Sequence, residues 1–438
     1  MSAREDCYRL CSRIMDGAFS NLAKSGNEGA FAHEWTDKVI AKRLLLEHIL
    51  GHYINKPLQK LDKEVRLTLM IGICELMYLD TPDNVAVSES VNMVRTLKKS
   101  SAASLVNAVL RSFIRDGKSI PPVEGDKFRR FSVENSVPLE LLKSVANDYG
   151  EDKAFLWGSN FNSVNHSVRV NTLKDEGKTY ERMLKGEKTD DPIAFLKSFG
   201  DDFRKGSMEK GVIYPQGISS QLCALAVGAG PGETVIDICA APGGKSFTMA
   251  VEMKNKGRLI SCDKTEKRCD LIKKGAQRLG LSVIEAKVND GTVRNAGFPA
   301  ADRVLCDVPC SGYGVIHNKP EIRYKPLSSF DTLPSVQYSI LETSSEYVKS
   351  GGTLVYSTCT VRRCENEDIV ERFLKEHPDF YGYDDIFDEK TLPSEDIPFT
   401  QAGVIERSHV IRAMEGSFMN TIFREGCDGF FIAVMRRK

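Results

Sequence analysis

Two cysteines could carry chemistry in this sequence, because each lies in a short run of small and polar residues directly after a stretch typical of a buried strand. Cys310 lies within Asp307-Val-Pro-Cys-Ser-Gly312, and Cys359 lies within Ser357-Thr-Cys-Thr360. A thiolate is a strong nucleophile, and covalent catalysis divides one difficult reaction into easier steps. Carbon 5 of a pyrimidine needs such help, because it becomes nucleophilic only after a thiolate adds to carbon 6. After alkylation, a base must remove the carbon-5 proton so that the thiolate can leave.

Each of these cysteines, taken alone, is also explained as a buried thiol, since a free cysteine commonly packs as a small hydrophobic residue. The chain holds 12 cysteines, and none of them forms a Cys-x-x-Cys pair. The seven histidines do not cluster beside them, so the sequence predicts no zinc site or other metal site. A disulfide framework is not expected either, because the chain is large and carries no secretion signal.

A glycine-rich turn, Cys239-Ala-Ala-Pro-Gly-Gly-Lys245, follows another predicted strand. Its glycine pair lets the backbone bend tightly and approach a ligand closely. The spacing matches neither Gly-x-Gly-x-x-Gly nor Gly-x-x-x-x-Gly-Lys-Ser/Thr, which disfavours a dinucleotide site and a P-loop. Asp263 ends the next predicted strand, about 20 residues further on, where an acid can accept hydrogen bonds from a ribose diol. The pattern predicts a nucleoside cofactor.

The elements that must position these groups alternate between strand and helix from residue 211 onwards. The predicted strands cover residues 234–239, 258–263, 282–287, 302–307 and 352–358, and the predicted helices cover 246–253, 267–279 and 337–348. Strands joined by helices indicate a parallel, doubly wound sheet, whose ligands bind beyond the carboxyl ends of the strands. Asp290 follows the third of these strands and Asp307 ends the fourth, which adds two acids to the same edge.

Residues up to about 117 have the apolar spacing of helices. The predicted helices cover residues 8–22, 44–53, 63–78, 85–97 and 103–114, and no segment there has strand periodicity. Basic residues gather towards the end of this region, among them Lys98, Lys99, Arg111 and Arg115. They are explained either as ordinary solvated surface or as a face that contacts RNA phosphates, because neutralising phosphates releases counterions.

Residues 126–210 have a mixed pattern typical of a small α+β module. It predicts helices over 139–149 and 179–184, a strand over 166–171, and a strand or helix over 193–199. Periodicity alone assigns this module no function.

Composition and charge exclude several classes of protein. Of the 438 residues, 41% are apolar and 27% charged, and 60 basic residues balance 60 acidic ones, so no global field attracts nucleic acid. The longest apolar stretch, residues 67–79, is too short to cross a bilayer, and the charged N-terminus lacks the apolar core of a signal peptide. We therefore expect a cytoplasmic, monomeric protein without a membrane partner.

Three motifs together resemble those of S-adenosylmethionine-dependent RNA cytosine-C5 methyltransferases. They are Ala240-Ala-Pro-Gly-Gly-Lys245, Asp307-Val-Pro-Cys-Ser-Gly312 and Ser357-Thr-Cys-Thr360, in that family's order and spacing. The segments Tyr214-Pro-Gln-Gly-Ile-Ser-Ser-Gln-Leu222 and Asp428-Gly-Phe-Phe-Ile-Ala433 are similar as well. The N-terminal helices, with Ser104-Leu-Val-Asn-Ala-Val-Leu-Arg111, resemble the NusB-like domain of the branch that methylates bacterial 16S rRNA, the RsmB, Sun or Fmu branch.

The resemblance implies three domains: an all-α NusB-like RNA-binding bundle over residues 1–125, a linker helix with a small α+β RNA-binding module over 126–210, and a Rossmann-like methyltransferase domain over 211–438. It implies Cys359 as the nucleophile, Cys310 as the group that aids product release, and Asp307 as a catalytic residue between the cofactor and the base. The residues that it assigns to S-adenosylmethionine are Cys239, Ala240, Ala241, Pro242, Gly243, Gly244, Lys245, Asp263, Arg268, Asp290 and Asp307. For contact with 16S rRNA, naked or in an assembling small subunit, it adds Arg169 and Asn171, in a segment similar to the family's Arg-Val-Asn strand, to the basic residues Lys98, Lys99, Arg111 and Arg115.

Two positions depart from the family's pattern. Val308 stands where alanine is usual, and Tyr313 stands where a small residue or threonine is usual. Both positions neighbour the expected pocket, so they are expected to change its shape and leave the reactive groups intact.

Three other functions remain open at this point. The same chemistry could act on a transfer RNA or 23S rRNA cytosine. An RNA-binding antitermination-like factor with an inert methyltransferase domain would keep the helices, but the intact Cys310, Cys359 and Asp307 disfavour it. A nicotinamide-dependent dehydrogenase would share the sheet, but the glycine spacing disfavours it.

Overall fold

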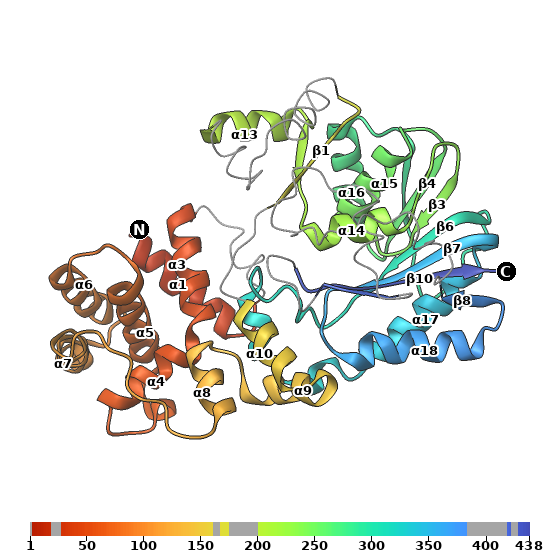
Figure 1. Ribbon diagram of the computed structural model, residues 1–438. Coiled ribbons are helices and arrows are strands. Elements are labelled where there is room, and N and C mark those ends of the chain that lie inside the picture. Colours follow the sequence, from red (N-terminus) through yellow and green to blue (C-terminus); the bar gives the residue numbers. More distant parts are fainter. Residues whose placement is uncertain (1, 19–27, 161–166, 175–199, 383–417, 422–427) are drawn as a thin grey trace, which may run out of the picture. The chain divides into compact units, whose positions relative to one another are not determined.

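A computed structural model describes residues 2–18, 28–160, 167–174, 200–382, 418–421 and 428–438 (Figure 1). The chain forms two compact units. The first contains residues 1–162 together with the segment Ile316–Lys325, and the second contains residues 163–315 and 326–438.

The first unit is helical, as predicted. Its helices are α1 (Ala3–Met15), α3 (Ala30–Ala41), α4 (Arg43–Tyr53), α5 (Lys63–Tyr78), α6 (Asp83–Thr96), α7 (Ala103–Arg115), α8 (Lys127–Glu134), α9 (Leu139–Tyr149) and α10 (Glu151–Ser159). Helix α5 is buried over most of its length and packs against α1, α3, α4, α6 and α7, which makes it the centre of the bundle. The prediction of a helix over 63–78 is confirmed, whereas the first predicted helix was too long, because α1 ends at Met15 where the Asp16 backbone caps it.

The segment Ile316–Lys325 packs with this helical unit although it follows the Cys310 loop in the chain. Its short 3-10 helix η4 (Pro320–Tyr324) contacts α3. Arg323 is 2% exposed and donates to the carbonyls of Ala41 and Ser136 at 3.2 and 3.1 Å. The guanidinium of Arg43 lies 5.1 Å from the ring centre of Tyr324. This insertion was not predicted, because its residues carry no long apolar period.

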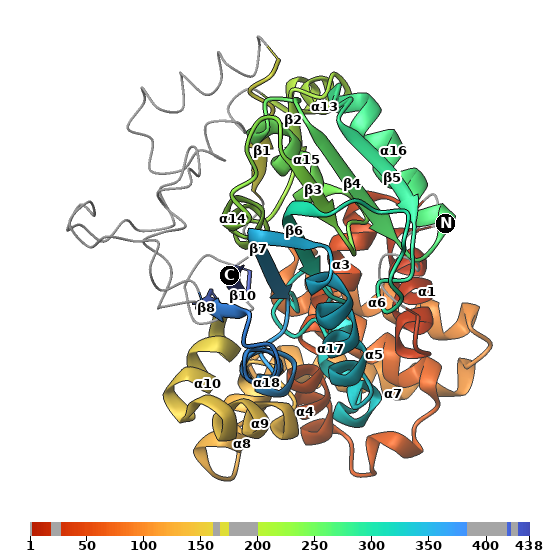
Figure 2. The ribbon, with the colours of Figure 1, turned by 90° about the vertical axis from the view of Figure 1, so that its right-hand side faces the viewer.

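The second unit is built on a sheet with the strand order β5-β4-β3-β6-β7-β10-β8, and β9 pairs with β10 (Figure 2). The strands are β3 (Thr234–Asp237), β4 (Arg258–Asp263), β5 (Ile284–Val288), β6 (Ala301–Asp307), β7 (Val348–Thr358), β8 (Phe380–Gly382), β9 (Phe418–Asn420) and β10 (Phe431–Arg437). The first five strands in this order are parallel, as predicted. Strand β10 runs antiparallel to β7, β8 and β9, so the sheet is mixed and not wholly parallel.

Helices cover both faces of this sheet because alternate strand residues face opposite sides. On one face, residues such as Val235, Leu259 and Leu305 pack against α14 (Ile218–Ala226), α15 (Gly244–Glu252) and α16 (Glu266–Leu279). On the other face, residues such as Ile236 and Val304 pack against α17 (Leu333–Ser345) and α18 (Glu367–Glu376). Figure 1 shows these two helical layers, and Figure 2 shows α16 beside the β5 edge and α18 beside the β8 edge. This three-layer arrangement is the Rossmann-like fold that the sequence predicts.

The small module before the sheet contains α13 (Gly200–Glu209) and an antiparallel pair formed by β1 (Val168–Val170) and β2 (Ile213–Pro215). The predicted elements at 179–184 and 193–199 lie outside the described residues. The predicted boundaries at 125 and 210 do not coincide with the two compact units, because α8 packs on α4 and α9, and α9 packs on α10.

Candidate active site

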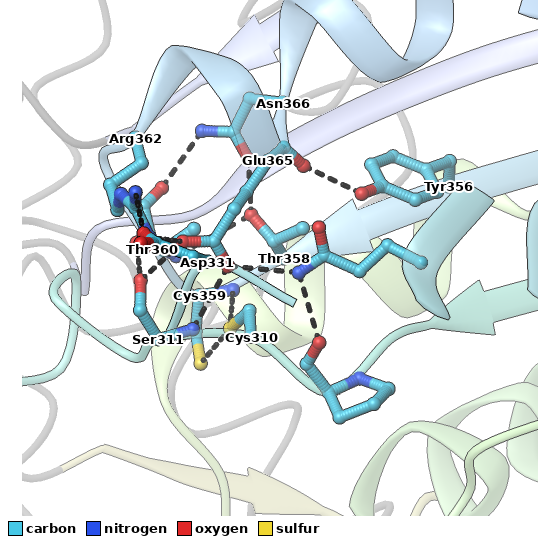
Figure 3. A network of polar contacts seen from close by, with 12 residues as sticks. Cys310, Ser311, Asp331, Tyr356, Thr358, Cys359, Thr360, Arg362, Glu365 and Asn366 are labelled. Carbon is cyan, nitrogen blue, oxygen red and sulfur yellow. Dashed lines mark hydrogen bonds and ion pairs between the residues drawn. The ribbon is translucent and has the colours of Figure 1, made fainter. Parts of the chain in front are cut away.

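The two cysteines singled out above meet at the carboxyl edge of the sheet (Figure 3). Strands β6 and β7 are parallel neighbours, so the loops that follow them emerge side by side. The Sγ atoms of Cys310 and Cys359 lie 3.2 Å apart, and the backbone N–H of Cys359 donates to Cys310 Sγ at 3.3 Å. Both side chains are partly exposed, so a substrate can reach them. The pairing predicted from two separate motifs is present in the structure.

The environment of Cys310 disfavours its thiolate form. The hydrogen bond with Cys359, together with burial, raises the pKa of Cys310 well above the usual range for a thiol. A protonated thiol is a poor nucleophile, so this environment does not favour Cys310 as the attacking group.

Asp307 ends β6 and is held from two sides. Ser357 Oγ donates to its Oδ1 at 2.8 Å, and Lys245 Nζ donates to its Oδ2 at 2.6 Å. Burial alone would lower the pKa of Lys245, but the carboxylate of Asp307 raises it above the usual value. The ammonium also lies 4.8 Å from the ring centre of Phe430. This charged pair places a fixed carboxylate and a fixed ammonium beside the thiols.

The glycine-rich turn joins β3 to α15. Gly243 has a φ of +114°, in the left-handed region, and a Cβ there would lie 2.3 Å from the Phe247 ring, so only glycine fits. Below the turn, Ser246 Oγ donates to Asp237 Oδ2 at 2.7 Å and accepts from Ser261 Oγ at 2.8 Å. These buried bonds fix the start of α15, whose N-terminus follows the turn.

Asp263 and Asp290 lie at the ends of β4 and β5, at the same edge. Asp263 is 3% exposed; its Oδ2 accepts from the Ala241 N–H at 3.3 Å, and its Oδ1 lies 3.4 Å from Arg268. Within the described part of the chain, that Oδ1 has no hydrogen-bond partner. Asp290 binds Thr292 and Lys264, and these bonds lower its pKa to about 2. A buried carboxylate oxygen left open beside a glycine turn is what a ribose diol requires, so these residues fit a nucleoside cofactor.

Comparison with known proteins agrees with this geometry. A family model for the 16S rRNA methyltransferase RsmB/F matches residues 224–436, and a NusB family model matches residues 3–115. The probable ribosomal RNA small subunit methyltransferase B of Bacillus subtilis (strain 168) is 37% identical, over 96% of this chain and 92% of that protein. The ribosomal RNA small subunit methyltransferase B of Proteus mirabilis (strain HI4320) is 30% identical, over 76% and 80%.

The chain belongs to the RsmB/F family of methyltransferases. Its fold is shared with the solved structure of the protein PH0851, with a TM-score of 0.72 at 22% identity over 100% of this chain and 99% of that one. It is therefore an RNA methyltransferase, and its cofactor is S-adenosylmethionine. The residues able to hold this cofactor are the glycine turn and Asp263, with Arg268 and Asp290 beside them.

The basic residues predicted to contact RNA in this RsmB/F chain lie on the helical unit. Lys98, Arg111 and Arg115 are exposed. Arg111 and Arg115 bond side chains of their own helix, Asn107 and Ser112. Lys99 is less open, because its Nζ binds Asp62 at 2.7 Å. Their contact with RNA stays a prediction.

Arg169 and Asn171, also predicted to contact RNA, are buried. Arg169 donates to Glu252 at 2.8 Å and to Gln221 at 3.3 Å. The Asn171 amide is fully buried and donates to the carbonyls of Gly211 and Leu279. Their polar atoms are used within the protein, so the structure favours a structural role, and the predicted RNA contact has no support from this geometry.

The two departures from the family's pattern are core positions. Val308 is 4% exposed and belongs to the cluster packed under α17, and Tyr313 is fully buried with its ring edge against Phe330. Each is enclosed by protein atoms, so any effect on the pocket must pass through packing.

Sequence reasoning missed three polar residues beside the thiols: Gln337, Glu365 and Asn366 (Figure 3 labels the last two). The signal for Glu365 and Asn366 was the polar run directly after the Cys359 loop, which resembles the start of an ordinary exposed helix, whereas Gln337 lies within the helix α17. Among the residues that the structure describes, no helix is long and apolar enough to span a membrane.

Proposed function

We propose that this methyltransferase modifies carbon 5 of a cytosine in 16S rRNA through a covalent bond between Cys359 and carbon 6, and that Cys310 aids release of the product. The observation that carries the proposal is the 3.2 Å separation of the two Sγ atoms at the ends of adjacent parallel strands. A nucleophile and a proton carrier that act on carbons 6 and 5 of one ring must lie about this close. The names of the relatives support 16S rRNA as the substrate.

The proposed reaction has three steps: addition, methyl transfer and elimination. The Cys359 thiolate adds to carbon 6, and the electron pair of the ring double bond makes carbon 5 nucleophilic. S-adenosylmethionine, which the glycine turn and Asp263 would hold, would supply an electrophilic methyl group for carbon 5, and S-adenosylhomocysteine would be its leaving group. A base then removes the carbon-5 proton, the double bond reforms, and Cys359 leaves as a thiolate.

Asp307 and Lys245 have defined tasks in this sequence. The Asp307 carboxylate is partly exposed and points to the edge where the base must lie, so it can accept a hydrogen bond from the amino group that distinguishes cytosine from uracil. Lys245 holds the Asp307 carboxylate in place through the 2.6 Å ion pair. Its ammonium also interacts electrostatically with Cys359, and a nearby cation is the environment that a nucleophilic cysteine requires.

The test uses unmodified 16S rRNA, labelled S-adenosylmethionine and denaturing gels. The Cys359→Ala variant is expected to form no protein–RNA adduct and to transfer no methyl group. The Cys310→Ala variant is expected to transfer the methyl group but to stay bonded to RNA, so that it runs as a slower band.

The double variant is expected to show no such band, because the bond depends on Cys359. If both thiols only pack the interior, each alanine costs about 1 kcal/mol of stability and leaves activity largely intact. An adduct with Cys359→Ala but not with Cys310→Ala would reverse the two roles. Parallel reactions with 23S rRNA and transfer RNA test the choice of substrate.

A further inference from the structure

Two adjacent residues, Glu365 and Asn366, each bind the chain next to one of the two cysteines. They lie at the junction between the 3-10 helix η6 (Arg363–Glu365) and α18, just beyond the Cys359 loop. Both are fully buried. Figure 3 shows them above the two cysteines in that view, with side chains that point in different directions.

Glu365 holds the Cys310 loop. Its carboxylate accepts from the backbone N–H of Ser311 at 3.0 Å and from Ser311 Oγ at 2.7 Å. Gln337 Nε2, from α17, donates to the same carboxylate at 2.8 Å and to the carbonyl of Pro309 at 3.0 Å. Both neighbours of Cys310 are thereby tied to the Glu365–Gln337 pair.

Asn366 holds the Cys359 loop in the same manner. Its Oδ1 accepts from Thr358 Oγ1 at 2.5 Å, and its Nδ2 donates to the carbonyl of Thr360 at 3.0 Å. Both neighbours of Cys359 are bound to this one amide. The hydroxyls of Ser311 and Thr360, 2.6 Å apart, join the two loops in addition to the contacts between the cysteines themselves.

The burial of Glu365 is not explained by stability. Burying a carboxylate is costly unless it is paired and fully hydrogen-bonded, and such groups are commonly replaceable by apolar residues without loss of stability. Arg362, 3.2 Å away, supplies the positive charge. What the arrangement does provide is rigidity, because a satisfied buried network fixes its members. A cysteine side chain has one rotatable bond to its sulfur, so fixing the backbone on both sides fixes Sγ.

We propose that Glu365 and Asn366 are positioning residues with separate targets: Asn366 sets Cys359 for addition to carbon 6, and Glu365, with Gln337, sets Cys310 for release. The proposal rests on the function proposed above. Misplacement of a reacting group by about 1 Å can cost about 100-fold in rate. Loosening one loop is therefore expected to slow one step and to leave the other nearly unchanged.

The test measures adduct formation and adduct release separately in single-turnover reactions with unmodified 16S rRNA, both free and in small ribosomal subunits. Asn366→Ala is expected to slow adduct formation at least about tenfold. Glu365→Gln is expected to slow release at least about tenfold and to accumulate the adduct. In this variant an amide NH2 group replaces one carboxylate oxygen, so one of the groups that donate to Glu365 loses its acceptor. Asn366→Ala is thus expected to lower the amount of adduct, and Glu365→Gln to raise it. A general loss of stability would not shift the two variants in opposite directions.

Two matched controls remove similar groups away from the cysteines. Glu75→Gln alters a buried glutamate that pairs with Arg4 in the helical unit. Asn255→Ala removes an amide that bridges Gly280 and Val283. Neither control is expected to change the ratio of the two rates. If Glu365→Gln or Asn366→Ala does not fold, Gln337→Ala and Thr358→Val break the same bonds and are expected to act in the same directions.

The outcomes separate the two proposals. If Cys359→Ala still forms the adduct, the proposed function is wrong. If the cysteine variants behave as expected but Glu365→Gln and Asn366→Ala both change the two rates equally, or behave like the controls, only the positioning proposal is overturned.

Discussion

The cysteine edge of the sheet and the basic surface of the helical unit use polar residues in opposite ways. At the cysteine edge, which comprises residues 307–312 and 357–366, polar side chains are mostly buried and bind one another. On the basic surface, defined by Lys98, Lys99, Arg111 and Arg115, the charged groups are exposed or paired with an exposed partner. The first arrangement fixes atoms in place, whereas the second keeps charge available to a partner.

The two regions are therefore expected to respond differently to salt and to substitution. Exposed charges separated by more than about 8–10 Å are screened at physiological ionic strength, whereas buried pairs are screened much less. Substitutions at the cysteine edge should therefore change reaction steps at any salt concentration. Substitutions on the basic surface should change RNA affinity, and should do so mostly at low salt.

The largest expected effect comes from breaking the ion pair between Lys245 and Asp307. Lys245→Met keeps the length of the side chain but leaves the carboxylate without its partner, and removal of one fixed charge of this kind costs about 100-fold or more in rate. Measurement of kcat/KM for methyl transfer at two salt concentrations checks this, and the loss should be the same at both.

The control is Lys273→Met on α16, which breaks an exposed pair with Glu266 and should leave the rate unchanged. The double variant Lys245→Met/Asp307→Asn should regain thermal stability, because no uncompensated charge remains, but not activity. A rate for Lys245→Met within threefold of wild type would break the contrast between the two regions.

The sequence predicted well those features that depend on residues close together in the chain. The proximity of Cys310 and Cys359, near Asp307 at the end of β6, was predicted because strands with a clear apolar pattern precede both cysteines and parallel neighbours bring such ends together. The helices over 63–78 and 139–149 were predicted at their observed bounds, because a strong apolar period and a following Pro82 or Gly150 mark them.

What the sequence did not predict depends on contacts distant in the chain. Glu365 binds Ser311, 54 positions earlier in the chain, and a polar residue before a helix gives no sign of such a bond. The segment Ile316–Lys325 joins the helical unit through Arg323 and Tyr324, whose partners lie more than 180 residues earlier. The burial of Arg169 and Asn171 has the same cause, because short alternating strands do not reveal which side chains become enclosed.

A smaller effect is expected at the cofactor side of the sheet edge. Asp263→Ala removes the buried carboxylate that faces the expected ribose hydroxyls, and each charge-assisted hydrogen bond is worth about 1.5–3 kcal/mol. Affinity for S-adenosylmethionine, measured by calorimetry, should fall at least about tenfold while the fold survives. Asp270→Ala, on the exposed side of α16, serves as the control. Unchanged affinity would remove Asp263 from the cofactor site.

The stability of the protein should also depend on pH through Asp237, which is buried below the glycine turn. Burial raises the pKa of Asp237 to about 7, against 3.8 for an ordinary aspartate. The folded state therefore holds a proton that the unfolded state releases, so this group's contribution is fully present below about pH 4 and is lost as the pH rises through 7. The slope is about 1.4 kcal/mol per pH unit.

Asp237→Asn should remove this slope. Between pH 5 and 7, the melting temperature of the wild type should fall relative to that of the variant by roughly 3–6 °C per pH unit. Differential scanning calorimetry checks this at two salt concentrations, and salt should matter little. Parallel curves for the two proteins would show that Asp237 does not titrate in this range.

The smallest effect on catalysis is expected from the basic surface. Replacing Lys98, Lys99, Arg111 and Arg115 together by glutamine should weaken RNA binding and leave kcat at saturating RNA unchanged. Each lost phosphate contact should reduce the slope of log affinity against log salt by about 0.7–0.9.

The two neighbouring lysines should differ in this respect. Lys98→Gln alone should reduce the slope more than Lys99→Gln, because Asp62 already neutralises Lys99. Binding titrations with 16S rRNA at four salt concentrations measure both slopes. An unaltered slope in the fourfold variant would make these residues ordinary solvated surface, and a large fall in kcat would mean that the helical unit acts on the chemistry as well as on binding.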